Sequence, residues 1–358
     1  MANIAVAGCG AIGGLAGFYM ARAGESVLFI DQNVDHVNAI QTRGISVNGV
    51  YGPMSIGAQR ACTPGEIEEP LAGLVFLACK SQATQSAVRA LVAHLTPESC
   101  VVSLQNGMNE DKIADIVGRE RTMGALPDYG GAYLDPGVLE AVHEGSVYVG
   151  ELDGSLTERA KEAARLLGIG PNKCELLTDI VGRLWTKLVY FSQAVVTALV
   201  DASMIEVFRN ETVQRLAGLV VREAMQVSDA AGIQLHTDRW FDPALYRVHT
   251  PDDTKRLFAA NERLVAHLGA HHVAAAPGGY QYVKKASGVH WDIVYRKRKS
   301  EAAYMTVVCV AERYGVRVPL NVGLLRLIAE IEDGSRQLGW HNIDELAAYA
   351  DELGLRLP

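Results

Sequence analysis

The sequence predicts two domains, an α/β domain with a mostly parallel sheet followed by an all-α domain. Three observations carry this prediction. The chain opens with a short apolar run, residues 3–7, that ends at a glycine-rich turn. Apolar β-branched runs and helical stretches then alternate up to about residue 177, as in parallel βαβ units. Beyond residue 179, long helical periodicity replaces this alternation. The length of 358 residues also favours two domains, and we expect them to span residues 1–177 and 178–358.

The glycine-rich turn has the spacing of a dinucleotide-binding turn. Residues 8–13 read GCGAIG, between the predicted strand 3–7 and a predicted helix over residues 14–23. In such a turn the first glycine permits the tight bend, the second lets the backbone approach a pyrophosphate, and the third lets the helix pack closely on the strand. The helix N-terminus adds free N–H groups and a positive dipole end. We therefore expect cofactor contacts at Gly8, Gly10, Ala11, Ile12 and Gly13.

Asp31 is the acidic residue that this kind of turn requires. It ends a second apolar run, residues 25–31, and follows Gly13 by 18 positions (31 − 13). Its carboxylate would accept hydrogen bonds from an adenosine ribose and repel a 2′-phosphate, which favours NAD(H). NADP(H) stays open as the alternative, because Arg43 lies nearby in the sequence and could meet a phosphate. The turn and this acid together predict a Rossmann-type domain.

The remaining elements follow from apolar runs and turn residues. Buried parallel strands are predicted at residues 72–79, 99–104 and 121–125, with a helix over 86–94. Residues 138–143 and 146–151 are expected to pair as a hairpin around Glu144 and Gly145. In the second domain, periodicity predicts helices over residues 180–200, 213–231, 252–268, 292–314 and 320–332. A loop is expected at residues 277–279, and a helix stop at Asp333 and Gly334.

Composition excludes several function classes. The net charge of −8 argues against nucleic acid as the partner, because binding a phosphate backbone requires a basic face. The sequence has no long uncharged apolar run, so no membrane span is expected. The six cysteines are scattered without CxxC spacing, which predicts reduced residues in a cytoplasmic protein and no metal site.

Two polar segments follow the third and fourth predicted strands. Ligands in an open parallel sheet bind beyond the carboxyl ends of the strands. Lys80 would place a cation near the cofactor or an anionic substrate, and Asn106 would offer a donor and an acceptor there. The alternative is a solvated lysine and an ordinary turn asparagine.

Lys187 is the candidate proton donor. It lies within a very apolar helix, among Trp185, Val189, Tyr190 and Phe191. Such neighbours would desolvate the amine and lower its pKa, which makes it a better acid near neutral pH. The alternative is a lysine whose amine reaches solvent.

A segment near residue 300 carries further polar candidates. It contains Ser287, Asp292 and Glu301, and Glu301 follows Arg298 by three positions. Glu301 could therefore be a surface ion-pair partner. The basic run 296–299 could be a solvated face or could attract an acidic substrate.

These features, in this order, resemble the ketopantoate reductase (2-dehydropantoate 2-reductase) family. The resemblance covers nearly the whole chain: GCGAIGG, CKSQAT, LQNGMNE, LWTKLV, SGVHWDIVYRKRKSE and YGVRVPLN. It implies a C-terminal domain like that of 6-phosphogluconate dehydrogenase, and hydride reduction of a small keto acid. It implies that Lys187 is the general acid, that Glu301 binds the substrate hydroxyl and orients the lysine, and that Ser287 contacts the substrate carboxylate. Asn106 and Lys80 would bind both cofactor and substrate.

Two departures from the family bear on the substrate and the cofactor. Family members place asparagines one and two helical turns after the lysine, where this chain has Phe191 and Val195. Their usual cofactor is NADPH, whereas Asp31 favours NADH. The sequence therefore leaves open a related hydroxyacid or opine-type dehydrogenase with a more apolar substrate, and a non-catalytic NAD(H) sensor. Its long apolar helices also favour a homodimer.

Overall fold

The computed structural model describes residues 2–238, 241–271, 274–275, 281–282 and 287–358. The chain divides into two compact units: Met1–Leu184 with Ala275–Tyr282, and Trp185–Ala274 with Val283–Pro358. The first unit is α/β and the second is helical, as the sequence predicts. The loop expected at residues 277–279 lies outside the described residues.

The first unit contains a mostly parallel main sheet. Its strand order is β12-β11-β8-β7-β6-β1-β2-β5. The strands are β1 (Ala2–Ala7), β2 (Val27–Ile30), β5 (Ala61–Cys62), β6 (Leu71–Leu77), β7 (Cys100–Ser103), β8 (Thr122–Pro127), β11 (Ser146–Glu151) and β12 (Lys173–Leu176). Only the pairing of β11 with β8 is antiparallel in this sheet. The predicted strands at 3–7, 72–79 and 99–104 are confirmed as β1, β6 and β7.

A second sheet of four strands corrects the predicted hairpin. It contains β3 (Ile45–Gly49), β4 (Met54–Ile56), β9 (Gly130–Asp135) and β10 (Val138–His143), in the order β4-β3-β10-β9. The two strands predicted at 138–143 and 146–151 exist, but they belong to different sheets. β10 pairs with β9 and β3, whereas β11 pairs with β8 and β12. Glu144 and Gly145 carry the chain from one sheet to the other.

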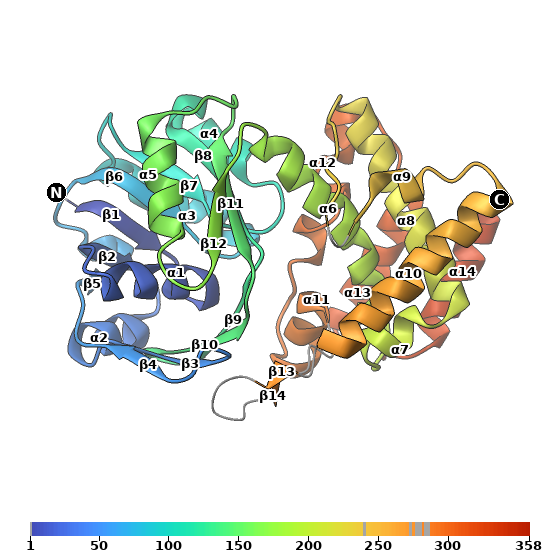
Figure 1. Cartoon of the computed structure of the whole chain (residues 1–358), viewed down its shortest axis with the longest axis horizontal. Helices are drawn as coiled ribbons and strands as arrows, with labels where there is room; N and C mark the ends of the chain where they lie inside the picture. Colours follow the sequence, from blue (N-terminus) through green and yellow to red (C-terminus); the bar gives the residue numbers. More distant parts are fainter. Residues whose placement is uncertain (1, 239–240, 272–273, 276–280, 283–286) are drawn as a thin grey trace. The chain divides into compact units, whose positions relative to one another are not determined.

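Helices cover both faces of the main sheet. On one face lie α1 (Ala11–Arg22) and α5 (Glu158–Leu167), which contact each other (Figure 1). On the other lie α3 (Thr84–Leu91) and α4 (Glu110–Val117), also in mutual contact. Alternate side chains of β1 divide between the two cores: Ile4 and Val6 pack in the first, and Ala5 and Ala7 in the second.

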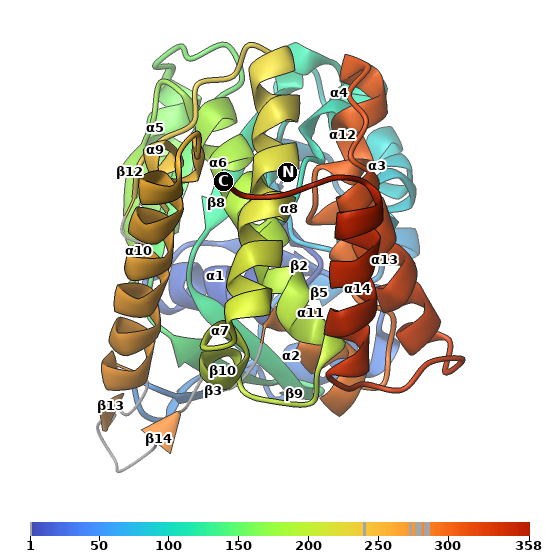
Figure 2. The same cartoon turned by 90° about the vertical axis from the view of Figure 1, so that its right-hand side faces the viewer.

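The second unit is helical and contains a large apolar cluster in its described part. The division between the units falls within α6 (Ile180–Val196). The helices that follow are α7 (Met204–Phe208), α8 (Glu211–Ala230), α9 (Pro243–Tyr246), α10 (Pro251–His271), α11 (Gly288–His290), α12 (Val308–Ala311), α13 (Pro319–Glu332) and α14 (His341–Glu352). Figure 2 shows α8, α13 and α14 side by side, and their mutual contacts enclose much of this core. No helix in the described part of the chain has the length and apolar character needed to cross a membrane.

The prediction of one long helix over residues 292–314 is wrong. The chain forms a π-helical turn at Trp291–Tyr295, a 3₁₀ turn at Ala302–Tyr304, and then α12. The buried Asp292 carboxylate accepts hydrogen bonds from the guanidinium groups of Arg296 (2.9 Å) and Arg298 (2.8 Å). Gathering both arginines around one carboxylate bends the backbone, and Lys297 between them has a left-handed φ of 49°. Helical periodicity carries no signal of this ion cluster.

Candidate functional site

The glycine turn fits a pyrophosphate. Gly8 has a φ of +90°, and its N–H donates to the carbonyl of Ile30 (2.8 Å). Gly13 lies so close to the Gly8 carbonyl that a side chain could not fit, whereas the space around Gly10 is open. Helix α1 begins at Ala11 without a side-chain cap and without an acidic residue in its first turn. Its first N–H groups and its positive dipole end therefore suit an anion at this turn.

Asp31 follows β2, and the local backbone fixes its carboxylate. One oxygen accepts from the N–H of Cys9 (2.7 Å) and the other from the N–H of Asn33 (2.9 Å). Arg43 lies at the opposite end of α2 (Val34–Thr42), about 13 Å along the helix axis. Its guanidinium donates to the carbonyl of Pro136 (3.2 Å). The described structure therefore does not place Arg43 beside the Asp31 carboxylate.

The segments that carry Lys80 and Asn106 are joined by hydrogen bonds. Lys80 is exposed at the end of the β6 segment, and Asn106 is half-buried after β7. The carbonyl of Asn106 accepts from the Ser81 hydroxyl and from the Asn109 side-chain amide, both at 2.8 Å. The Asn109 amide also donates to Ser81 Oγ (3.0 Å). Sequence reasoning missed Ser81 and Asn109, although both lie inside the two quoted motifs.

Glu110 is an unusual buried acid at the start of α4. Its side chain lies in the interior, and one carboxylate oxygen accepts from the N–H of Asn109 (3.0 Å). Burial raises the pKa of Glu110 to about 7, because desolvation disfavours the charged form.

Lys187 lies on the least buried stripe of α6. The half-buried residues of this helix include Arg183, Lys187, Phe191 and Ala194, whereas Val195 is fully buried in the helical core. A helix advances about 100° per residue. Val195, eight residues after Lys187, is therefore rotated by about 80° from it, whereas Ala194, seven residues after, is rotated by only about 20°. Of the two apolar replacements, Phe191 shares the stripe of Lys187, and Val195 packs against the core.

Ser287 and Glu301 bracket the irregular segment of the second unit. Ser287 is buried and caps α11, accepting from the N–H of His290 (3.3 Å). Glu301 is 6% exposed, so it does not lie on a solvated surface as the ion-pair alternative supposed. The Arg298 guanidinium donates to the Asp292 carboxylate. π-helical turns and left-handed non-glycine residues occur often at functional sites, which makes this segment a candidate site on its backbone alone.

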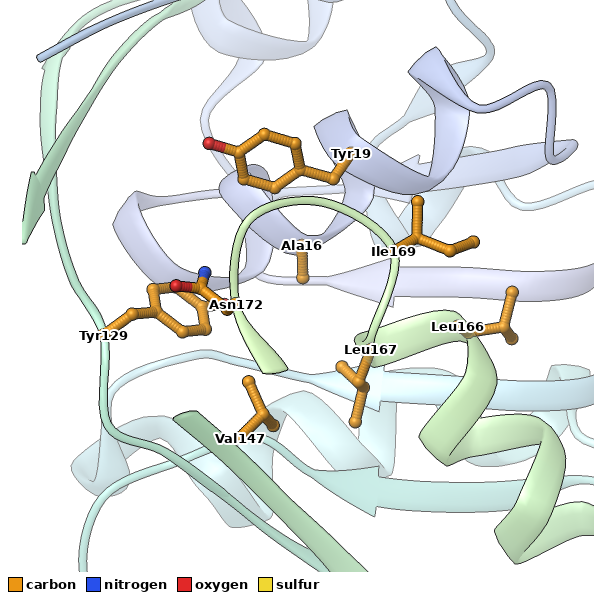
Figure 3. Close-up of a pocket in the computed structure, with 8 residues that line it drawn as sticks. All are labelled: Ala16, Tyr19, Tyr129, Val147, Leu166, Leu167, Ile169 and Asn172. Carbon is orange, nitrogen blue, oxygen red and sulfur yellow. The ribbon is translucent and has the colours of Figure 1, made fainter. Parts of the chain in front are cut away.

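A small cavity beneath α1 is too small for a substrate. Its volume is about 10 Å³, enough for about one water molecule. Figure 3 shows its lining, which comes from α1, α5, β11 and the adjoining loops: Ala16, Tyr19, Tyr129, Val147, Leu166, Leu167, Ile169 and Asn172.

The fold and the glycine turn define a Rossmann-type dinucleotide-binding protein with a helical second unit. Two family models match: "Ketopantoate reductase PanE/ApbA" over residues 4–154, and its C-terminal counterpart over residues 179–332. The chain belongs to the ketopantoate reductase family. It is an NAD(P)-dependent oxidoreductase that acts on the CH–OH group.

Curated relatives agree with this membership, and solved structures share the fold. A 2-dehydropantoate 2-reductase of Archaeoglobus fulgidus is 26% identical over 93% of this chain and 98% of its own. That of Pyrococcus abyssi is 28% identical over 65% of this chain and 75% of its own. The fold resembles a ketopantoate reductase from Ralstonia eutropha (22% identity, TM-score 0.74, covering 93% and 99% of the two chains). It also resembles a D-mandelate dehydrogenase with NADH and anilino(oxo)acetate (21%, 0.74, covering 92% and 98%).

Proposed function

We propose that this protein reduces a small 2-keto acid to the hydroxy acid, with NADH as its preferred cofactor and Lys187 as the general acid. The observation that carries the proposal is the stripe on α6, where Lys187 and Phe191 are both half-buried one turn apart. An acid beside an apolar ring suits a carbonyl group that carries an apolar tail.

Residues of the first unit would bind the cofactor. The free N–H groups at Ala11, Ile12 and Gly13 would hold the pyrophosphate, and the Asp31 carboxylate would accept the ribose hydroxyls. Lys80 and Asn106 would contribute a cation and an amide to cofactor and substrate. The Arg43 guanidinium donates to the Pro136 carbonyl at the far end of α2, which supports the preference for NADH.

Residues of the second unit would act on the substrate. When bound, the nicotinamide supplies a hydride to the carbonyl carbon. The Lys187 ammonium group donates a proton to the carbonyl oxygen as negative charge develops there. The Ser287 hydroxyl oxygen accepts a hydrogen bond when it caps α11, so its O–H can still donate to the substrate carboxylate. Glu301 binds a substrate hydroxyl where there is one and orients the lysine.

The test is consumption of NADH and NADPH by the purified protein with ketopantoate and a panel of 2-keto and 3-keto acids with apolar tails. We expect the apolar 2-keto acids to turn over fastest. Lys187→Ala should lower kcat/KM by about 10²–10⁴-fold while leaving the affinity for NADH within about twofold. Wild-type turnover by this variant would reject Lys187 as the acid. Turnover that required an added amino acid would indicate an opine-type dehydrogenase, and tight NADH binding without turnover a sensor.

A second assay tests the cofactor preference. Asp31→Asn keeps the size of the side chain but removes the charge, so NADPH should no longer be repelled. We expect the ratio of kcat/KM for NADH over NADPH to fall about tenfold or more. Asp35→Asn, in the first turn of α2, is the matched control and should change the ratio far less. An unchanged ratio in Asp31→Asn would reject the assignment.

A further inference from the structure

We propose that His36 is a positioning residue for the dinucleotide turn, which it holds by a hydrogen bond to the carbonyl group of Cys9. This role rests on the dinucleotide binding described under the proposed function. The sequence gives no sign of it, because His36 lies in a helix and not in the turn.

The hydrogen bonds of His36 define its tautomer. The side chain is 1% exposed. Its Nδ1 accepts from the backbone N–H of Gly137 (3.0 Å), and its Nε2 lies 2.8 Å from the carbonyl oxygen of Cys9. A backbone N–H can only donate, so Nδ1 is the unprotonated nitrogen. The imidazole is therefore neutral, with its proton on Nε2, and it donates to Cys9.

Cys9 is held at three points as a result. Its N–H donates to the Asp31 carboxylate (2.7 Å), its carbonyl accepts from His36, and its Sγ lies 3.4 Å from the carbonyls of Val6 and Ile30. The residues on either side are glycines, which have the largest conformational freedom of any residue. Fixing Cys9 between them would keep the turn in one conformation before the cofactor arrives, and such preorganisation raises affinity.

His36 has a rigid support of its own. Gly137 lies in the turn between β9 and β10, and its carbonyl accepts from the N–H of Ser46 next to it in β3 (2.8 Å). The His36 ring also packs edge-on against Tyr133 of β9, with centroids 5.0 Å apart. The second sheet thus supports the dinucleotide turn through one imidazole.

Two variants separate the two hydrogen bonds of His36. In His36→Asn, the side-chain oxygen can replace Nδ1 as acceptor for Gly137, but nothing reaches the Cys9 carbonyl. In His36→Gln, the amide nitrogen can replace Nε2 as donor to Cys9, but the Gly137 N–H loses its acceptor. Each variant loses one buried hydrogen bond, so their stabilities should fall by similar amounts.

The readouts are NADH affinity, measured by fluorescence titration, and kcat at saturating NADH. We expect His36→Asn to raise the Kd for NADH about tenfold and His36→Gln to change it less than twofold, with kcat within twofold in both. Equal Kd changes in the two variants, or none in His36→Asn, would overturn the role of His36. A wild-type protein that bound neither NADH nor NADPH would instead overturn the dinucleotide binding itself.

A measurement on the wild-type protein covers the case in which a variant does not fold. In ¹⁵N-histidine spectra, His36 should show the neutral Nε2–H tautomer, and adding NADH should shift the Nε2–H resonance. The other tautomer, or a resonance that NADH leaves in place, would contradict the proposal.

Discussion

At the scale of single residues, the proposed function makes Phe191 the side chain that selects among keto acids. It occupies the stripe of α6 that carries Lys187, at a position where family members place an amide. A substrate that needs a hydrogen bond there would leave a polar group unpaired on burial, which is a strong ground for rejection. An apolar tail loses nothing at the same place.

We predict that Phe191→Asn redirects the substrate preference. Ketopantoate should gain about 10–100-fold in kcat/KM relative to an apolar 2-keto acid, because the new amide supplies the missing hydrogen bond. Parallel kinetics on the two substrates would measure this ratio.

Val195→Asn is the matched control. Val195 is fully buried in the helical core, so an amide there would cost about 1–3 kcal/mol of stability and leave the substrate ratio unchanged. A ratio that moved in Val195→Asn and not in Phe191→Asn would show that the wrong residue has been assigned.

At the scale of elements, α4 begins with a buried acid whose pKa the fold raises. Burial raises the pKa of Glu110 from 4.5 to about 7, so the folded chain retains a proton that the unfolded chain loses between these pH values. The stability that this raised pKa contributes is fully present below pH 4.5 and is lost as the pH rises through 7. We expect the free energy of unfolding to fall by about 2–3 kcal/mol over this range.

Urea unfolding between pH 4.5 and 8 tests this prediction. Glu110→Gln keeps an acceptor for the Asn109 N–H and cannot ionise, so its stability should depend less on pH and exceed that of the wild type above pH 7. Glu151 is the control, since it is buried but accepts hydrogen bonds from Nε and Nη2 of Arg159 at 2.7 and 2.8 Å. Glu151→Gln should lose stability at neutral pH. An unchanged pH slope in Glu110→Gln would assign the dependence to other groups.

Elements also show what the sequence could and could not predict. The strands β1, β2, β6, β7 and β8 of the main sheet were predictable because buried parallel strands are apolar runs, whereas the short β5 and the polar β12 were not predicted. The dinucleotide turn was predictable because its glycines have fixed spacing. The second sheet was missed, since its short strands alternate or contain glycine, and its pairing joins residues 45–49 with 138–143. The break after Asp292 was missed because ion clusters have no period. Lys80, Asn106, Lys187, Ser287 and Glu301 remain predictions as site residues.

At the scale of the whole molecule, the two units have separate cores. The clusters on the two faces of the main sheet contain residues up to Leu176, and the helical cluster begins at Phe191. Proteins built this way often depart from two-state unfolding. A ligand that binds only the folded form stabilises it in proportion to the logarithm of its concentration over Kd.

We predict two calorimetric transitions with unequal responses to NADH. At 100 times its Kd, NADH should add about 2.7 kcal/mol to the unfolding free energy of the first unit and move the other transition much less. NADPH at the same concentration should have a smaller effect. A single transition that NADH moves as a whole would contradict separate unfolding of the units.

The position of β1 has a consequence for how the chain is made. This strand is synthesised before the other strands of its sheet, yet it lies between β2 and β6 in the finished sheet. Its pairing with β6 must wait until Leu71–Leu77 has been synthesised, which takes several seconds at about 5–20 residues per second. During that interval one edge of an apolar strand is open to other chains, and such edges promote aggregation. Slower translation before residue 71 would lengthen this exposure, and chaperone binding to nascent chains should be strongest there.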